Sequence, residues 1–227
     1  MKFTSNHIAG VLEHKRQVGN ELNKFSSELF KRGVSHDYSK FSDEEMLIFE
    51  QVTPNLKKLT YGSEEYKAQL KAIEPALNHH YANNSHHPEY HQNGIQDMNL
   101  MDIVEMLCDW MAAVKRHENG NIFKSININR ERFGYSEELK SILLNTVRSL
   151  HKYCIDWECC DGRKGGYVAD DINDLHHQID KDIDIEEELK KDLKYGFFRE
   201  FQNQDYTNKS VCWKNGFSVQ WTNLIER

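Results

Sequence analysis

The chain contains little that would interrupt or cross-link it. Only three of its 227 residues are proline and twelve are glycine, so long helices are permitted. The five cysteines are odd in number and none has a two-residue spacing to the next, which favours reduced thiols over a disulfide framework. Cys159 and Cys160 are adjacent, so they and nearby Cys154 and His151 do not fit the usual spacing of zinc ligands.

Long apolar runs and excess positive charge are also missing. No stretch reaches the roughly 18 consecutive apolar residues of a membrane span, and no apolar segment follows a basic start at the N-terminus. We therefore expect a cytoplasmic protein without membrane association. The net charge of −7 argues against nucleic-acid binding through bulk charge, although a local basic pocket for a phosphate stays compatible with it.

Apolar residues at helical spacing predict a mostly helical chain. A first helix is expected from about His7, and Gly33 is expected to end it. From position 7 to 29, residues spaced by three or four share one face that is mostly apolar and includes His7 itself. Pro54 is expected to break the second helix and Pro75 to kink the third. The further helices are expected over residues 42–52, 63–82, 98–117 and 136–158.

The composition changes near residue 160, where we predict a boundary between residues 1–160 and 161–227. The second part holds an acidic helical stretch with an apolar stripe from Ile185 to Phe197. It ends in two β-prone runs around Asn215-Gly216, the pair most typical of a tight hairpin, so we expect a β-hairpin over residues 211–221. The predicted fold class is therefore all-α with a small C-terminal hairpin.

Histidines crowd one short stretch of the sequence. Residues 79–90 hold four of the twelve histidines, and imidazole is a common metal ligand. Helical phase points His80 inward and leaves His79 on the surface. The helix is expected to stop at Asn83–Ser85, so that His86 and His87 can fold back beside His80.

The order of candidate ligands is His … His-Asp … His … His … Asp. This order resembles the HD superfamily of metal-dependent phosphohydrolases over residues 7 to about 117. His36-Asp37-Tyr38-Ser39-Lys40 is similar to that superfamily's His-Asp-x-Gly-Lys motif, and His86-His87-Pro88-Glu89 to its His-His-x-Glu variants. The chain also resembles a family of HD-like proteins found largely in phages and bacteria. Ser39 replaces the usual glycine, and no Gly-Tyr-Pro follows the histidine pair, which argues against cyclic-dinucleotide hydrolysis.

The resemblance implies an HD-type helical bundle around one or two divalent ions. His7, His36, Asp37 and Asp109 would bind the first metal, and His80, His86 and His87 the second, with Asp37 bridging. Lys40 would contact the phosphate of a small substrate, a nucleotide or a similar phosphate ester. Mixed histidine and carboxylate ligands suit Mn, Fe, Co, Ni or Zn, and spacing does not select among them.

Several alternatives stay open at this level. Asp102 competes with Asp109 as the late ligand, and Glu105 could orient a ligand histidine from behind. A di-iron oxygenase has nearly the same ligand pattern on the same scaffold. The acidic C-terminal third also fits a non-catalytic HD-like protein that binds a nucleotide or a protein partner. The sequence assigns no oligomeric state.

Overall fold

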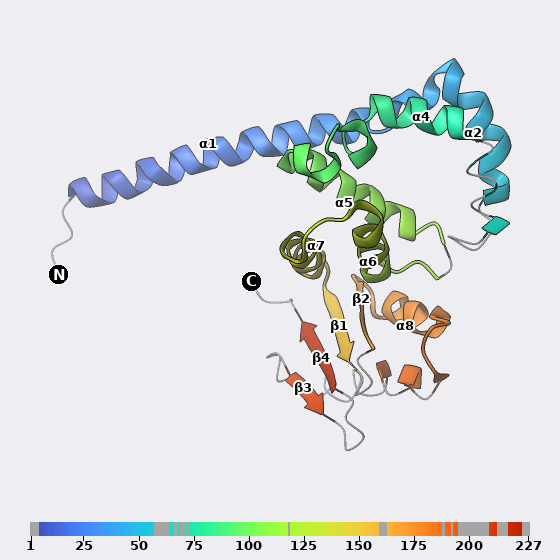
Figure 1. The fold of residues 1–227 in the computed structure, drawn as a ribbon. Coiled ribbons are helices and arrows are strands. Elements are labelled where there is room, and N and C mark those ends of the chain that lie inside the picture. Colours follow the sequence, from blue (N-terminus) through green and yellow to red (C-terminus); the bar gives the residue numbers. More distant parts are fainter. Residues whose placement is uncertain are drawn as a thin grey trace. The chain divides into compact units, whose positions relative to one another are not determined.

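The structure is a computed structural model, and it describes residues 5–56, 64–65, 68, 71, 73–117, 119–158, 163–187, 189–191, 193–194, 209–212 and 218–223 (Figure 1). It is mostly helical with one small antiparallel sheet, which confirms the predicted fold class. The chain divides into two compact units, Met1–Cys108 and Asp109–Arg227. The boundary predicted near residue 160 falls instead within the sheet of the second unit.

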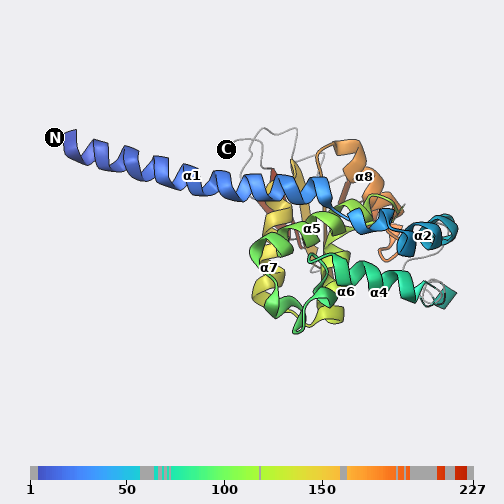
Figure 2. The same cartoon turned by 90° about the horizontal axis from the view of Figure 1, so that it is seen from above.

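The first unit is built from helices. Its first helix, α1, is a single unbroken element in both views (Figures 1 and 2), and it passes through Gly33, which the sequence analysis had placed at its end. Helix α2 packs against α4 and η1. In chain order the elements are α1 (Ser5–Ser35), η1 (Tyr38–Phe41), α2 (Asp43–Leu56), α4 (Glu74–Asn83), η2 (Pro88–Tyr90), η3 (Gly94–Asp97) and the start of α5 (Leu100–Val114).

Two predictions about proline are wrong. Helix α2 continues through Pro54 to its end at Leu56, so Pro54 lies in the last turn and does not terminate the helix ahead of it. Pro75 lies in the first turn of α4, where its missing N–H has no helical partner to lose, so it starts the helix and does not kink it. Most of the predicted helix before residue 73 lies outside the described residues. The predicted stop at Asn83 is confirmed.

The interior of the first unit is unusually polar. Glu45, His80, His86 and Asp102 are all buried, and Glu45 is 0% exposed. Buried polar groups need hydrogen-bond partners, since leaving one unsatisfied costs about 1–3 kcal/mol. These buried side chains therefore need hydrogen-bond partners within the unit.

The second unit combines helices with a sheet. Helix α6 packs against α7 and β2, and α8 also packs against β2. The four strands run antiparallel to their neighbours in the order β2-β1-β4-β3. After α5, the elements are α6 (Ile122–Phe133), α7 (Glu137–Leu150), β1 (Tyr153–Glu158), β2 (Lys164–Ala169), α8 (Ile172–Lys181), β3 (Lys209–Cys212) and β4 (Ser218–Asn223).

The predicted hairpin is present. The predicted C-terminal end of the helix expected over residues 136–158 is wrong. Strands β3 and β4 pair antiparallel, with Cys212 opposite Ser218, while Asn215-Gly216 lies outside the described residues. The helix expected to reach Glu158 stops at Leu150, and the chain then forms β1. Strand β1 is central because both β2 and β4 pair with it, and those backbone hydrogen bonds override the helical spacing of its apolar residues.

The apolar core of the second unit lies between the sheet and its helices. Ile155 and Tyr167 of the sheet are buried against Leu175 and Ile179 of α8. The acidic stretch contributes Ile185, Leu189 and Leu193 to the same core, which confirms that part of the predicted stripe, while Phe197 lies outside the described residues. Among the described residues, no helix has the length and apolarity needed to cross a membrane.

Candidate metal centre

The backbone at Asp37 is in an uncommon conformation. Asp37 follows the end of α1 and precedes η1, with φ at 56° and ψ at 22°. Among the described non-glycine residues it alone has a positive φ. Left-handed geometry is tolerated by Asp more readily than by most residues, and it is concentrated at functional sites. The turn directs the Asp37 carboxylate into the unit, toward the histidines of the crowded stretch.

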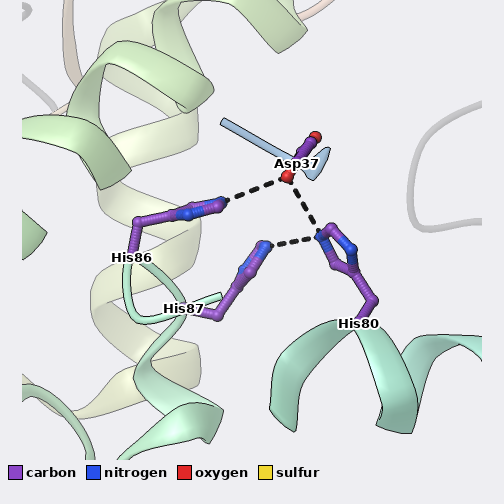
Figure 3. Close-up of side chains that lie close together, drawn as sticks. All are labelled: Asp37, His80, His86 and His87. Carbon is purple, nitrogen blue, oxygen red and sulfur yellow. Dashed lines mark hydrogen bonds and ion pairs between the residues drawn. The ribbon is translucent and has the colours of Figure 1, made fainter. Parts of the chain in front are cut away.

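Four side chains converge at this point (Figure 3). Asp37 Oδ1 lies 3.3 Å from His80 Nε2 and 3.5 Å from His86 Nε2. His87 Nε2 lies 3.0 Å from His80 Nε2. One ligand atom from each of the four residues falls within 4.8 Å of all the others, which is an arrangement that could hold a metal ion.

A second group adjoins the first and shares His86 with it. His36, His86 and Glu105 also bring ligand atoms within 4.8 Å of one another. His36 Nε2 lies 3.5 Å from Asp37 Oδ2, and the rings of His36 and His86 are 4.5 Å apart between centroids. The structure thus places His36, Asp37 and the histidine cluster together, as the sequence analysis expected.

Glu105 holds two of these histidines from behind. Its Oε1 lies 2.9 Å from His36 Nδ1 and 3.2 Å from His86 Nδ1. When Nδ1–H donates to a carboxylate, the lone pair of the neutral ring is left on Nε2. Both imidazoles therefore present an acceptor nitrogen toward Asp37, which is the tautomer a metal ligand needs.

Glu45 performs the same task for His80. The fully buried Glu45 carboxylate lies 3.0 Å from His80 Nδ1 through Oε2 and 2.7 Å from His79 Nδ1 through Oε1. Ser39 Oγ is also within 3.1 Å of His80 Nδ1. His80 is buried and His79 half-buried, so helical phase identified the inward histidine correctly. His79 is nonetheless tied to the same carboxylate.

An outer layer of charge supports Glu105. Arg32 Nη1 donates to Asp102 Oδ1 at 2.7 Å and to Glu105 Oε2 at 3.2 Å. Ser85 Oγ donates to Asp102 Oδ1 at 2.8 Å. Burial would raise the pKa of Asp102, but the Asn99 N–H, Arg32 and Ser85 outweigh it and lower that pKa. Asp102 therefore binds Arg32 and Ser85, and it supports Glu105 through their shared partner Arg32.

The carboxylates of the centre stay ionised near neutral pH. Burial alone would raise the pKa of Asp37, but its contact with His80 and its ion pair with Lys40 hold that pKa well below the usual range. Burial would likewise raise the pKa of Glu105, and the hydrogen bonds from His36 and His86 lower it far more. Ionised carboxylates at this point favour binding of a cation.

Two buried atoms of the cluster lack hydrogen bonds. Asp37 Oδ1 and His86 Nε2 are buried, and neither has a hydrogen-bond partner. An unpartnered buried acceptor costs about 1–3 kcal/mol, and such groups are rare in folded proteins. Because both atoms face the same point as His80 Nε2, one cation there would satisfy them together. The residues present therefore fit a divalent metal.

His7 is not part of this cluster. It lies in the first turn of α1, exposed to solvent. At 1.5 Å per residue, the helix keeps it about 40 Å from the end of α1 that leads into His36. The expected role of His7 as a ligand of the first metal is therefore wrong for this structure, because one straight helix separates the two positions.

The remaining predicted residues lie on known elements. Lys40 Nζ is 2.5 Å from Asp37 Oδ2, and its side chain is 40% exposed, so it borders the centre. Asp109 is half-buried on α5, one turn after Glu105 and on the same helix face. Along the chain, the first compact unit ends at Cys108 and the second begins at Asp109.

Sequence reasoning missed Glu45 and Arg32. The sequence analysis assigns neither residue a role in the site. No local pattern marks either one, since an acidic first turn and a basic last turn are ordinary helix features. Glu105 was expected to orient a histidine, and the structure places it in contact with two.

Comparison with known proteins identifies a family but no activity. Residues 4–153 match the model of a family described as "Family of unknown function (DUF5662)", and the chain belongs to that family. The match spans the whole candidate centre. No curated protein and no solved structure matches the chain.

Proposed function

We propose that this chain is a metal-dependent phosphohydrolase of the HD type, acting on a nucleotide or another small phosphate ester. The observation that carries the proposal is the convergence of Asp37 Oδ1 and His86 Nε2, buried and without hydrogen bonds, on the point that His80 Nε2 and His87 Nε2 also face. The order of these ligands along the chain supports assignment to the HD superfamily.

The proposed ligands fall into two adjoining sets. Asp37, His80, His86 and His87 would hold one ion. His36 and Asp37 would hold the other, for which the order of ligands along the chain predicts Asp109 as the third ligand. Divalent ions bound in this way would lower the pKa of a bound water and neutralise charge on a phosphoryl group. Mn, Fe, Co, Ni and Zn all suit such nitrogen and oxygen ligands.

The protein groups around the ions have separate tasks. Glu45 and Glu105 keep the imidazoles in the tautomer that presents Nε2 to the ion. Lys40 neutralises Asp37 in the free protein. Because its ammonium is partly exposed at the edge of the cluster, it is also the group we assign to the substrate phosphate.

The sharing of His86 between two ligand groups also suits a di-iron oxygenase. Two ions within one shared ligand set are common to both chemistries. Metal analysis of protein purified without added metal separates them. Two irons with a visible absorption band would favour the oxygenase, whereas colourless Mn, Co or Zn would favour the hydrolase.

The direct test is a phosphatase screen over nucleotides and generic phosphate esters with Mn, Co, Ni, Fe and Mg. We expect hydrolysis of at least one small phosphate ester, lost in Asp37→Asn and His86→Ala. His177→Ala, which removes an exposed histidine in the second unit, is the matched control and should retain activity. A screen without hydrolysis for any metal, by protein that does bind metal, would refute the hydrolase proposal.

A further inference from the structure

Helix α1 carries a stripe of exposed apolar side chains. Ile8, Val11, Val18, Leu22 and Phe25 share one face and are each between 43% and 64% exposed. Their spacings alternate between three and four residues once Lys15 is included, which averages the 3.5-residue repeat of a coiled coil. A repeat of this kind predicts pairing with another helix.

The charged residues of α1 outside the stripe are balanced in sign. Glu13 pairs with Arg16 at 2.6 Å, and Glu21 pairs with Lys24 at 2.8 Å. Helices that lie on membranes have polar faces rich in Lys and Arg. The balanced face of α1 therefore favours a protein partner over an anionic lipid surface.

One edge of the stripe is complementary to itself. His7, His14, Glu21 and Glu28 follow one another at seven-residue intervals, so they line the same edge. If a second copy of α1 lies antiparallel, His7 faces Glu28 of that copy and His14 faces Glu21. Imidazole N–H groups then donate to carboxylates on both sides of the twofold axis. Parallel pairing would place these four residues opposite the other edge, which includes Gly19 and Ser26 and offers no charge.

The apolar residues fit the same antiparallel register. Ile8 would face Phe25 of the second copy, and Val11 would face Leu22. Lys15 would face Val18, with its aliphatic stem on the seam and its ammonium in water. A single charged residue at a seam position is a known means of selecting one register. The overlap from Ile8 to Phe25 lies within the exposed part of α1 and leaves Arg32 in its contacts with Asp102 and Glu105.

Gly19 provides a further, independent indication. It lies in the middle of α1, where glycine is among the least favourable residues for a helix. Within one copy, a Cβ at Gly19 would meet no atom of the described residues within 4 Å, so none of them requires glycine there. Gly19 borders the stripe on the edge opposite His14. A second helix approaching closely at this edge would require a residue without a side chain.

We infer that α1 pairs antiparallel with α1 of a second copy of this chain, and that the protein is a dimer joined through residues 8–25. The inference concerns a surface far from the metal ligands and does not depend on the proposed hydrolase activity.

The test is the mass of the full chain in solution, measured by sedimentation equilibrium over a wide range of concentration. We expect twice the mass of one chain. Val18→Ser/Leu22→Ser should give a monomer, whereas Gln17→Ser/Asn20→Ser on the polar face should remain a dimer. Circular dichroism and metal content report whether each variant stays folded.

Charge exchange tests the orientation. Glu21→Lys/Glu28→Lys should weaken the dimer by about tenfold in Kd, since four exposed pairs are lost by symmetry. Adding His7→Glu/His14→Glu to that variant should restore the affinity, because each pair is then reversed. A full chain that stays monomeric with α1 helical, binding to anionic vesicles in place of dimerisation, or failure of the exchanged variant to recover would each overturn the inference.

Discussion

Replacing Glu45 by glutamine exchanges one carboxylate oxygen for an amide nitrogen inside a fully buried side chain. The two oxygens of Glu45 lie 2.7 Å from His79 Nδ1 and 3.0 Å from His80 Nδ1. Glutamine keeps one acceptor for these two N–H groups, and its NH₂ group donates to the other ring. If that ring is His80, its proton moves to Nε2, the atom that faces Asp37 and His87. We therefore expect weaker metal binding from a change that touches no ligand.

The expected magnitude follows from the number of acceptors lost. Residues that orient a ligand from behind typically contribute 10–100-fold to metal affinity. Glu45→Gln keeps one acceptor, so we expect a loss of about tenfold, or about 1.4 kcal/mol. Glu45→Leu removes both acceptors, and we expect a loss of about 100-fold, or about 2.7 kcal/mol.

The assay is competition for the metal against a chromophoric chelator, with circular dichroism to confirm the fold. Glu44→Gln is the matched control, because it makes the same chemical change at the exposed neighbouring residue of α2. If Glu45→Leu folds and binds metal as tightly as the unmodified chain, His80 is not oriented by Glu45 and the proposed ligand arrangement is wrong.

Four further predictions follow from the same contacts. His7→Ala should leave the metal content per chain unchanged, whereas His86→Ala should lower it, as measured by elemental analysis. Arg32→Ala should lower the free energy of unfolding by about 3 kcal/mol, measured with urea, because the buried Asp102 loses its counter-charge. Folding lowers the pKa of Asp102 from 3.8, so its contribution to the free energy of unfolding is complete above that pH and is lost as the pH falls. Asp102→Asn should therefore flatten the dependence of stability on pH on the acid side. Gly166→Ala should destabilise the second unit by about 1–3 kcal/mol, since a Cβ there would lie 2.7 Å from the Phe123 ring.

Each of these has a clear contrary result. Loss of metal in His7→Ala would mean that the first turn of α1 lies at a metal site after all. An Arg32→Ala protein as stable as the unmodified chain would show that Asp102 is satisfied without the guanidinium. Unchanged acid sensitivity in Asp102→Asn, or unchanged urea unfolding in Gly166→Ala, would contradict the corresponding contact. Ser141→Ala, at an exposed position of α7, is the control for the second unit.

Local features of the sequence were enough to predict much of the site. His80 was assigned inward, and the helix stop at Asn83 placed His86 and His87 where they can turn back. Both depend on short-range geometry, since helical phase and turn residues act within a few positions. The pairing of β3 with β4 was likewise predicted from the hairpin signal at Asn215-Gly216.

Other features were decided only by contacts between distant segments. The sequence by itself determined the order of ligands, the inward face of their helices and the repeat along α1, because each is a matter of spacing along one element. The tertiary structure alone decided that Glu45 and Glu105 meet the histidines, and that His7 stands a helix length away. It also decided that Tyr153–Glu158 is a strand, since only its two partner strands make the extended form favourable. Helical spacing fixes which way a side chain points, whereas the distance between two helices depends on how the whole unit packs.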